Sequence, residues 1–121
     1  MTYVEEITYV DPARAFAGVA GERFSLLFDS ALPSARLGRY SYIAALPRRT
    51  LTARHRAVTV DGRTVDGDPF VVLQDELART PRLTLSGLPA FQGGAAGAFG
   101  YDLCNHLETL PEPATDDMDF D

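Results

Sequence analysis

The chain has 121 residues, of which 45% are hydrophobic and 23% are charged, and its formal net charge is −6. This length suits one domain with its own core and is too short for two. The acidic charge argues against general nucleic-acid binding, which needs a positive surface, and no hydrophobic run approaches the roughly 18 residues of a membrane span.

The start of the chain carries acids where a signal peptide would carry basic residues. The only cysteine, Cys104, leaves no partner for an internal disulfide, which fits a reducing cytoplasm. All eleven basic residues are arginines. The absence of lysine excludes Schiff-base chemistry and the lysine of a phosphate loop.

The first part of the chain predicts strands on either side of a short helix. Residues 2–10 mix β-branched and aromatic residues as a strand does. Asp11 and Pro12 supply a helix cap and a proline at the first helical position. Residues 24–28 predict a buried strand because they are apolar on both faces. After a loop rich in proline, serine and glycine, residues 39–46 predict another strand.

The middle of the chain has an antiparallel pattern that ends in a helix. A strand over residues 49–55 is followed by a hairpin over residues 57–65, with Asp61 and Gly62 in its two-residue turn. Residues 69–79 then predict an amphipathic helix whose apolar residues recur at helical spacing. Those residues are Phe70, Leu73 and Leu77. The sequence therefore predicts an α+β fold, mainly an antiparallel β-sheet with two or three short helices.

A glycine-rich stretch, FQGGAAGAFGYDL, occupies residues 91–103. Its glycines lack the spacing of a dinucleotide-binding fingerprint, and Asp102 stands where a phosphate loop needs a cation. Alternation along the stretch instead predicts a strand with a bare face that allows close packing. The leucines at 103, 107 and 110 follow at helical spacing.

The titratable side chains do not form an evident catalytic group. His55 lies among arginines, which makes it a poor base. Cys104 and His106 are two residues apart, so on a helix they point away from each other and form neither a nucleophile pair nor a metal site. Glu108 is interpreted as a surface or packing acid. We assign no catalytic residue and no metal ligand to this chain.

Arginine is concentrated in the middle of the sequence. Seven of the eleven arginines lie within residues 36–63, where Asp61 is the only acid. Such a cluster suits an anion-binding patch, but solvated edges of exposed strands explain it as well, and we favour the second interpretation.

The residues between the second and third predicted strands suggest an amino-acid site. Asp29 or the Ser30 hydroxyl could bind an ammonium group, and Arg39 in the following loop could bind a carboxylate. The alternative is a strand–loop–strand corner with ordinary capping bonds, which is favoured by the sequence alone.

FQGGAAGAFGYDL followed by LETLPE resembles the N-terminal half of component I of aminodeoxychorismate synthase, with anthranilate synthase component I as a close second. The order LLFDS, RYSYIAALP and DPFVVLQDEL supports the resemblance. It implies the N-terminal part of the chorismate-utilising fold. The whole enzyme would convert chorismate and ammonia to 4-amino-4-deoxychorismate for 4-aminobenzoate and folate synthesis, with Mg²⁺ bound by the complete enzyme and ammonia supplied by a glutamine amidotransferase subunit (component II).

The resemblance also implies where function lies. The chorismate site and metal ligands would belong to the C-terminal chorismate-binding half, and this chain alone would be inactive. The N-terminal half would contribute a tryptophan pocket, which maps here to Ser30, Leu37, Gly38, Arg39 and Tyr40. Asp29 stands where anthranilate synthases typically have glutamate, and this shorter acid favours the folate branch.

We expect residues 1–112 to form one domain and residues 113–121 to be an acidic linker or a truncated end. The chain is expected in the cytoplasm, without nucleic-acid or membrane partners, and with a tendency to self-associate through the surface that the other half would cover. Two alternatives stay open: a domain of anthranilate synthase component I, for tryptophan synthesis, and a self-standing amino-acid-binding regulatory module.

Overall fold

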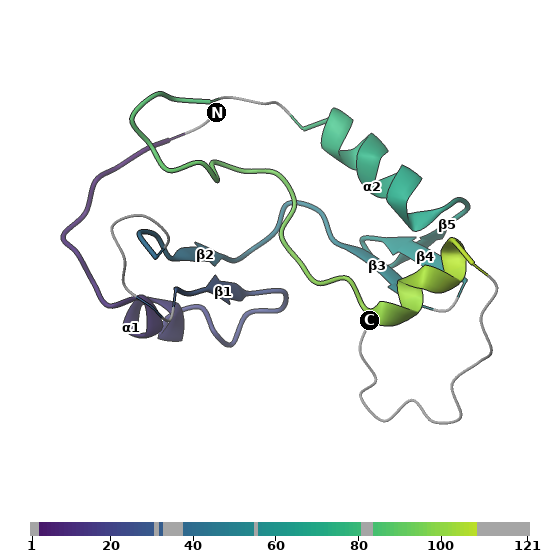
Figure 1. Cartoon of the computed structure of the whole chain (residues 1–121), viewed down its shortest axis with the longest axis horizontal. Helices are drawn as coiled ribbons and strands as arrows, with labels where there is room; N and C mark the ends of the chain where they lie inside the picture. The colour runs from purple at the N-terminus through teal and green to yellow at the C-terminus, as the bar shows by residue number, and fades with distance from the viewer. Residues whose placement is uncertain (1–2, 31, 33–37, 55, 81–83, 109–121) are drawn as a thin grey trace. The chain divides into compact units, whose positions relative to one another are not determined.

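The computed structural model describes residues 3–30, 32, 38–54, 56–80 and 84–108, apart from the side chains of two residues, 102 and 105. The chain forms two compact units (Figure 1). Unit 1 comprises Met1–Pro47 and Pro81–Ala96, and unit 2 comprises Arg48–Thr80 and Gly97–Asp121. Each unit contains one small antiparallel sheet, which confirms the predicted α+β class. Residues 113–121 lie outside the described part.

Unit 1 begins its regular structure with helix α1, Pro12–Ala17. The Asp11 carboxylate accepts a hydrogen bond from the Arg14 amide at 3.1 Å, and Pro12 fills a position whose N–H has no helical partner. The helix ends at Gly18. The predicted cap-plus-proline start is therefore confirmed.

The sheet of unit 1 has two strands, β1 (Leu26–Phe28) and β2 (Tyr42–Ala44). They are antiparallel, with Leu27 opposite Ile43. Both predicted strands exist in shortened form, but the expectation that the first is buried was wrong, because Phe28 is 44% exposed. α1 contacts both strands.

The prediction of a strand over residues 2–10 was wrong for residues 3–10, which are the part that the structure describes. Residues 3–10 pair with no strand among the described residues, and Tyr3 and Tyr9 are more than four-fifths exposed. The β-branched and aromatic composition is suited to a strand, but a strand forms only where another segment accepts its backbone hydrogen bonds.

Unit 2 is built on a three-stranded sheet in the order β3-β4-β5. The strands are β3 (Leu51–Arg54), β4 (Ala57–Val60) and β5 (Arg63–Val65). The predicted hairpin is confirmed, because Asp61 and Gly62 adopt φ values of 50° and 73° between β4 and β5. Positive φ at both turn positions matches the right-handed twist of the flanking strands.

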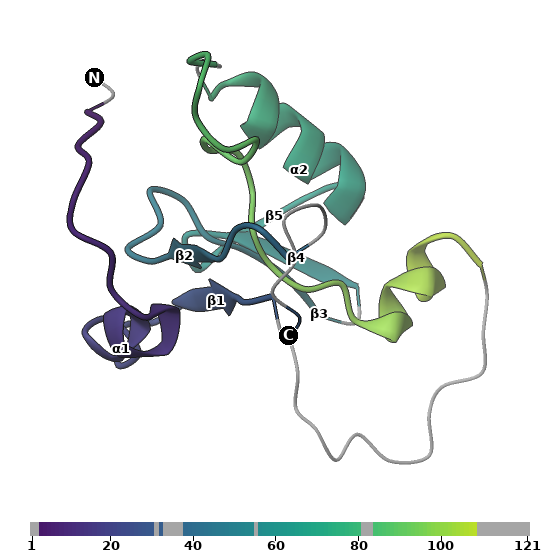
Figure 2. The same cartoon turned by 60° about the vertical axis from the view of Figure 1, so that its left-hand side comes forward.

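Helix α2, Pro69–Ala78, lies along this sheet (Figures 1 and 2). It starts as predicted, since the Asp68 carboxylate accepts bonds from the amides of Phe70 (2.9 Å) and Val71 (3.2 Å). On the sheet, the side chains of Val58 and Val60 share one face and are 1% and 7% exposed. They are the only buried large hydrophobic residues in the described part of the chain.

The glycine-rich stretch is not a strand in the structure, and its glycines are not closely packed. A Cβ added at Gly93, Gly94, Gly97 or Gly100 would meet no atom within 4 Å. Gly93 and Gly94 instead adopt φ values of 133° and 123°, which other residues rarely reach. Gly93 and Gly94 therefore allow a backbone conformation that other residues rarely adopt. The expectation that the glycines pack closely against another segment was wrong.

Gln92 shows why the chain bends at this point. Its side-chain amide donates to the carbonyl oxygens of Leu85 and Pro89, both at 3.0 Å, and its oxygen accepts from the Leu85 amide at 2.8 Å. Three bonds from one side chain close a loop within unit 1. A side chain used in this way competes with the continuous ladder that a strand would need.

After the glycines, Tyr101–His106 form a 3-10 helix, η1, where α-helical spacing was expected. Leu107 caps it, and Leu110 lies outside the described residues. Phe99, just before η1, stacks its ring on Phe70 of α2 within unit 2, with centroids 6.2 Å apart. In the described ranges, no helix has the length and apolar character that crossing a membrane requires.

Candidate functional site

The residues singled out by the sequence lie in a corner of unit 1 where β1 ends and β2 begins. The Ser41 hydroxyl donates to Asp29 Oδ1 at 2.6 Å, and the Ser30 amide donates to the same oxygen at 2.9 Å. The Ser30 hydroxyl donates to the Tyr40 carbonyl at 3.1 Å. Two of these bonds, from Ser41 to Asp29 and from Ser30 to Tyr40, join the two strand ends, as the capping alternative expects.

Arg39 contacts the corner through an aromatic ring and not through a hydrogen bond to a described residue. Its guanidinium carbon lies 5.1 Å from the centre of the Tyr40 ring, within the range of a cation–π contact. Gly38 is half-buried, and Leu37 lies outside the described residues. The structure thus brings Ser30 and Tyr40 together and places Arg39 over the Tyr40 ring, where its charged group is accessible.

Aromatic rings extend from this corner, and the sequence interpretation missed them as a group. The rings of Tyr40 and Tyr42 are 6.3 Å apart, and Tyr42 meets Phe91 edge-on at 5.7 Å. Tyr40 is 41% exposed and Phe91 is 40% exposed. We call Tyr40, Tyr42 and Phe91 the aromatic row. The two-residue spacing of the tyrosines indicates that they share a face, but Phe91 comes from a distant segment.

Together, the corner and the aromatic row have the chemistry of an amino-acid site. An aromatic ring could stack or pack edge-on against the row, and a carboxylate could pair with Arg39. The Ser30 hydroxyl and the Tyr40 carbonyl, which bond to each other, are further polar groups of the corner. The sequence singled out Ser30, Arg39 and Tyr40, whereas only the fold shows that Tyr42 and Phe91 continue the row from Tyr40.

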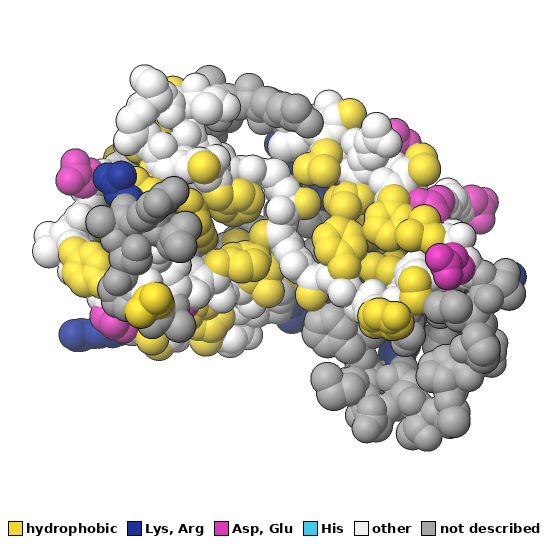
Figure 3. Space-filling view, viewed as in Figure 1, with side chains coloured by type: hydrophobic (Ala, Val, Ile, Leu, Met, Phe, Trp, Pro, Cys, Tyr) yellow, Lys and Arg dark blue, Asp and Glu magenta, His cyan; other side chains and the backbone are white. Residues whose placement is uncertain are grey.

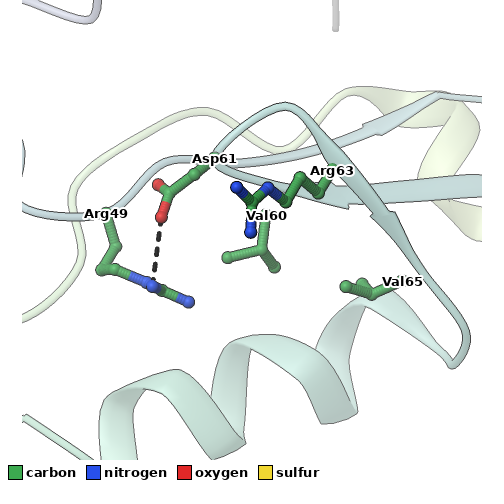
Figure 4. Close-up of a pocket in the computed structure, with 5 residues that line it drawn as sticks. All are labelled: Arg49, Val60, Asp61, Arg63 and Val65. Atoms are coloured by element: carbon green, nitrogen blue, oxygen red, sulfur yellow. Dashed lines mark ion pairs between the residues drawn. The ribbon is translucent and has the colours of Figure 1, made fainter.

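A hollow of about 410 Å³ lies within unit 2 (Figure 4). It is lined by Arg49, Val60, Asp61, Arg63 and Val65. The two valines form an apolar wall, while Arg49 Nη1 pairs with Asp61 Oδ2 at 3.1 Å.

Arg49 also contacts α2. Its Nε and Nη2 atoms lie 3.2 Å from the two carboxylate oxygens of Glu76, so the two groups meet as a fork. Arg79 pairs with the same carboxylate at 2.8 Å. Part of the arginine-rich region is therefore neutralised within unit 2, which supports a structural role for Arg49.

The other titratable candidates remain separate. Cys104 is a free, half-buried cysteine on η1, and Glu108 is exposed. Within the described ranges, no three His, Cys, Asp or Glu side chains lie close enough to hold a metal ion. His55 lies outside the described residues.

The fork between Arg49 and Glu76 should stabilise unit 2 more than an ordinary surface ion pair. The Glu76 side chain is only 17% exposed, so solvent screens the pair less than usual. In a double-mutant cycle with Arg49→Ala and Glu76→Ala, we expect a coupling energy of about 1 kcal/mol, measured by urea denaturation. The pair Arg79 and Glu76 is the matched control, because the Arg79 side chain is 70% exposed. Equal coupling in both cycles would contradict the prediction.

Comparisons with known proteins show which class of protein this chain is similar to. No protein-family model matches the chain, and no solved structure matches it. Curated proteins do match it, and each of the relatives described below is named as component 1 of a synthase. The chain spans about a fifth of the length of these relatives.

The relatives are named anthranilate synthase component 1. The chain is 35% identical over 103 residues to the protein of Streptomyces coelicolor, covering 84% of this chain and 18% of the relative. It is 37% identical over 117 residues to that of Mycobacterium tuberculosis, covering 88% and 22%. For the probable anthranilate synthase component 1 of Schizosaccharomyces pombe the identity is 32% over 97 residues, covering 80% and 18%.

These names support the expected likeness to component I enzymes. They favour the anthranilate member over the aminodeoxychorismate member, which was the first choice from the sequence. The second of the two resemblances is therefore the better supported one.

Proposed function

We propose that this chain is the N-terminal part of an anthranilate synthase component 1. The observation that carries the proposal is 32–37% identity to proteins of that name over 76–88% of the chain. The whole protein would form anthranilate from chorismate, with ammonia from a glutamine amidotransferase subunit. The chorismate-binding half would come from chain outside these residues, and the single cysteine fits a cytoplasmic enzyme.

The shorter acid at position 29 does not separate the two branches. Asp29 uses one carboxylate oxygen to accept from both Ser41 and the Ser30 amide. An aspartate thus has a local reason to stand at this corner, whatever reaction the enzyme performs. The names of the relatives carry the choice between the two branches.

The Mg²⁺ of the complete enzyme is not assigned to this chain. Magnesium prefers carboxylate oxygens in octahedral geometry, and the described residues offer no cluster of acids that fits. The role proposed for this part is ligand binding, in which Ser30, Leu37, Gly38, Arg39 and Tyr40 form a tryptophan pocket. The aromatic row beside Arg39 supports the proposal, because it offers an apolar surface to an indole ring.

The test of the activity uses the complete gene product. With chorismate, Mg²⁺ and ammonium, we expect anthranilate to form, followed by its fluorescence, whereas the 121-residue chain should form none. Formation of 4-amino-4-deoxychorismate would move the protein to the folate branch. Failure to consume chorismate would overturn both assignments.

The pocket is tested on the same protein by calorimetry with tryptophan. Arg39→Ala should weaken binding by at least about tenfold, since it removes a charge-assisted contact worth roughly 1.5–3 kcal/mol. Arg23→Ala is the matched control, because Arg23 also lies over an aromatic ring, that of Phe24 at 5.3 Å, but not in the corner. Equal affinity in the two variants would remove Arg39 from the pocket.

A further inference from the structure

The hollow drawn in Figure 4 lies on the face of the unit 2 sheet that carries the buried core. Between β4 and β5, Val60 is paired with Arg63, and Val58 is paired with Val65. Side chains that are directly opposite each other in an antiparallel pair lie on the same face. Arg63 and Val65 therefore share the face of Val58 and Val60. The apolar wall of the hollow continues the core, but it is not closed, because Val65 is only half-buried.

The two arginines of the hollow differ in what balances their charge. Arg49 is held by the carboxylates of Asp61 and Glu76. Both oxygens of Asp61 are in use, since Oδ1 accepts from the Thr50 amide and Oδ2 pairs with Arg49. Arg63 is exposed, and its guanidinium forms no hydrogen bond or ion pair with any residue that the structure describes. Among the residues that line the hollow, Arg63 therefore carries the unbalanced charge.

This charge stands beside an apolar surface of suitable size. The volume of about 410 Å³ is within the usual range of small-molecule sites, about 300–1,000 Å³. Hydrophobic side chains also reach the surface over the elements of unit 2 in Figure 3, so the unit offers a ligand apolar contact as well as charge. A guanidinium presents two parallel N–H groups that fit the two oxygens of a carboxylate. An inorganic phosphate would use the charge but leave Val60 and Val65 without a partner.

We propose that the hollow binds a small organic monocarboxylate, with its carboxylate on the Arg63 guanidinium and its apolar body against Val60 and Val65. This inference does not rest on the proposed function, because every residue of the hollow belongs to unit 2, whereas the residues proposed for the tryptophan pocket belong to unit 1. The sequence favoured solvated strand edges for the arginine-rich region, and the hollow gives one of these arginines a ligand.

The site is tested on the complete gene product with benzoate as the probe. Methyl NMR is the readout, because Val60 and Val65 carry the methyl groups of the apolar wall. We expect their signals to shift saturably with benzoate, while those of Val71, on α2 and outside the hollow, stay unchanged. Benzyl alcohol keeps the ring without the charge, and acetate keeps the charge without the ring. Each should bind at least about fivefold more weakly than benzoate.

Two results of this titration would overturn the proposal. The first is the absence of any shift at Val60 and Val65. The second is an affinity for benzyl alcohol or inorganic phosphate that equals the affinity for benzoate, because the site would then not recognise the combination of a carboxylate and an apolar body.

Substitutions locate the two parts of the ligand. Arg63→Gln should weaken benzoate binding by at least about tenfold, since it removes a charge-assisted hydrogen bond. Arg56→Gln is the matched control, because Arg56 is an exposed arginine in the turn between β3 and β4 and does not line the hollow. Val65→Thr keeps the shape of the wall but adds a hydroxyl, and it should weaken benzoate while leaving acetate unchanged. Equal benzoate affinity in Arg63→Gln and Arg56→Gln would remove Arg63 from the site and end the proposal.

A loss of binding must also be separated from a loss of folding. Arg63 is exposed, so the midpoint of urea denaturation should be the same for Arg63→Gln as for the parent protein. Arg63→Lys provides a second comparison, because it keeps the charge but not the parallel N–H groups. Its benzoate affinity should lie between those of the parent and Arg63→Gln. If Arg63→Gln does not fold, an Arg63→Lys variant that binds benzoate as tightly as the parent would contradict the carboxylate pairing.

Discussion

Replacing Val58 with alanine should lower the free energy of unfolding of unit 2 by about 2 kcal/mol, the usual scale for removing buried methyl groups. Val58 is 1% exposed and lies opposite Ala53 and Val65 on the neighbouring strands. Val60 is the only other buried large hydrophobic residue in the described part. Few neighbouring side chains can therefore move to fill the space that Val58→Ala leaves. Urea denaturation followed by circular dichroism measures the effect, with the protected sheet amides as a second readout.

Two further variants make the Val58 experiment specific. Val58→Thr keeps the shape but buries a hydroxyl, and we expect it to cost at least about 1 kcal/mol. Val71→Ala on α2 is the control, because Val71 is 54% exposed and alanine favours the helix. If Val71→Ala destabilised the chain as much as Val58→Ala, the core would not lie where the structure places it.

Replacing Asp61 with alanine should also cost about 2 kcal/mol, for three reasons that act at one residue. Asp61 has a φ of 50°, a conformation that alanine adopts at a cost of about 1 kcal/mol. Its Oδ1 accepts from the Thr50 amide at 2.9 Å, and its Oδ2 pairs with Arg49 at 3.1 Å. Alanine removes both contacts. The midpoint of urea denaturation is the measurement.

Asparagine separates the contributions of the turn and the ion pair. Asp61→Asn keeps an oxygen for Thr50 and tolerates positive φ, but it loses the charge that pairs with Arg49. We expect it to cost less than about 1 kcal/mol, since the pair is half-exposed. Equal losses for asparagine and alanine would mean that the ion pair, and not the turn conformation, carries the stability at this position.

The correct predictions concern signals that act between neighbouring residues. Asp11 with Pro12 and Asp68 with Pro69 each start a helix, because a capping carboxylate needs only the amides two or three residues ahead. Asp61 and Gly62 form the hairpin turn for an equally local reason. Such bonds are nearly independent of the rest of the fold, so the sequence reveals them.

The wrong predictions concern segments whose structure depends on distant partners. Residues 3–10 have the composition of a strand but no pairing segment among the described residues. The glycine-rich stretch alternates as a strand does, yet Gln92 closes a loop through Leu85 and Pro89. Nothing in the local pattern indicates that contact, because its value depends on where the chain returns.

The candidate site divides in the same way. Asp29, Ser30 and Arg39 are chemically suited to an amino-acid ligand, and their short separation in the sequence suggests a shared corner. Ser41, which completes the hydrogen bonds of Asp29, and Phe91, which packs on Tyr42, become visible only in the fold. The position of Arg39 over the Tyr40 ring likewise becomes visible only in the fold.

The amino-acid sequence by itself determined the α+β class, the helix starts, the hairpin turn and the likeness to component I enzymes, because these depend on neighbouring residues or on the order of motifs. Only the tertiary structure decided that the glycines at 93 and 94 serve a bend, that Arg49 joins the hairpin turn to α2, and that the β1–β2 sheet is open on both faces. Burial and long-range pairing arise from where distant segments meet, and a pattern of apolar residues does not specify which segment will cover it.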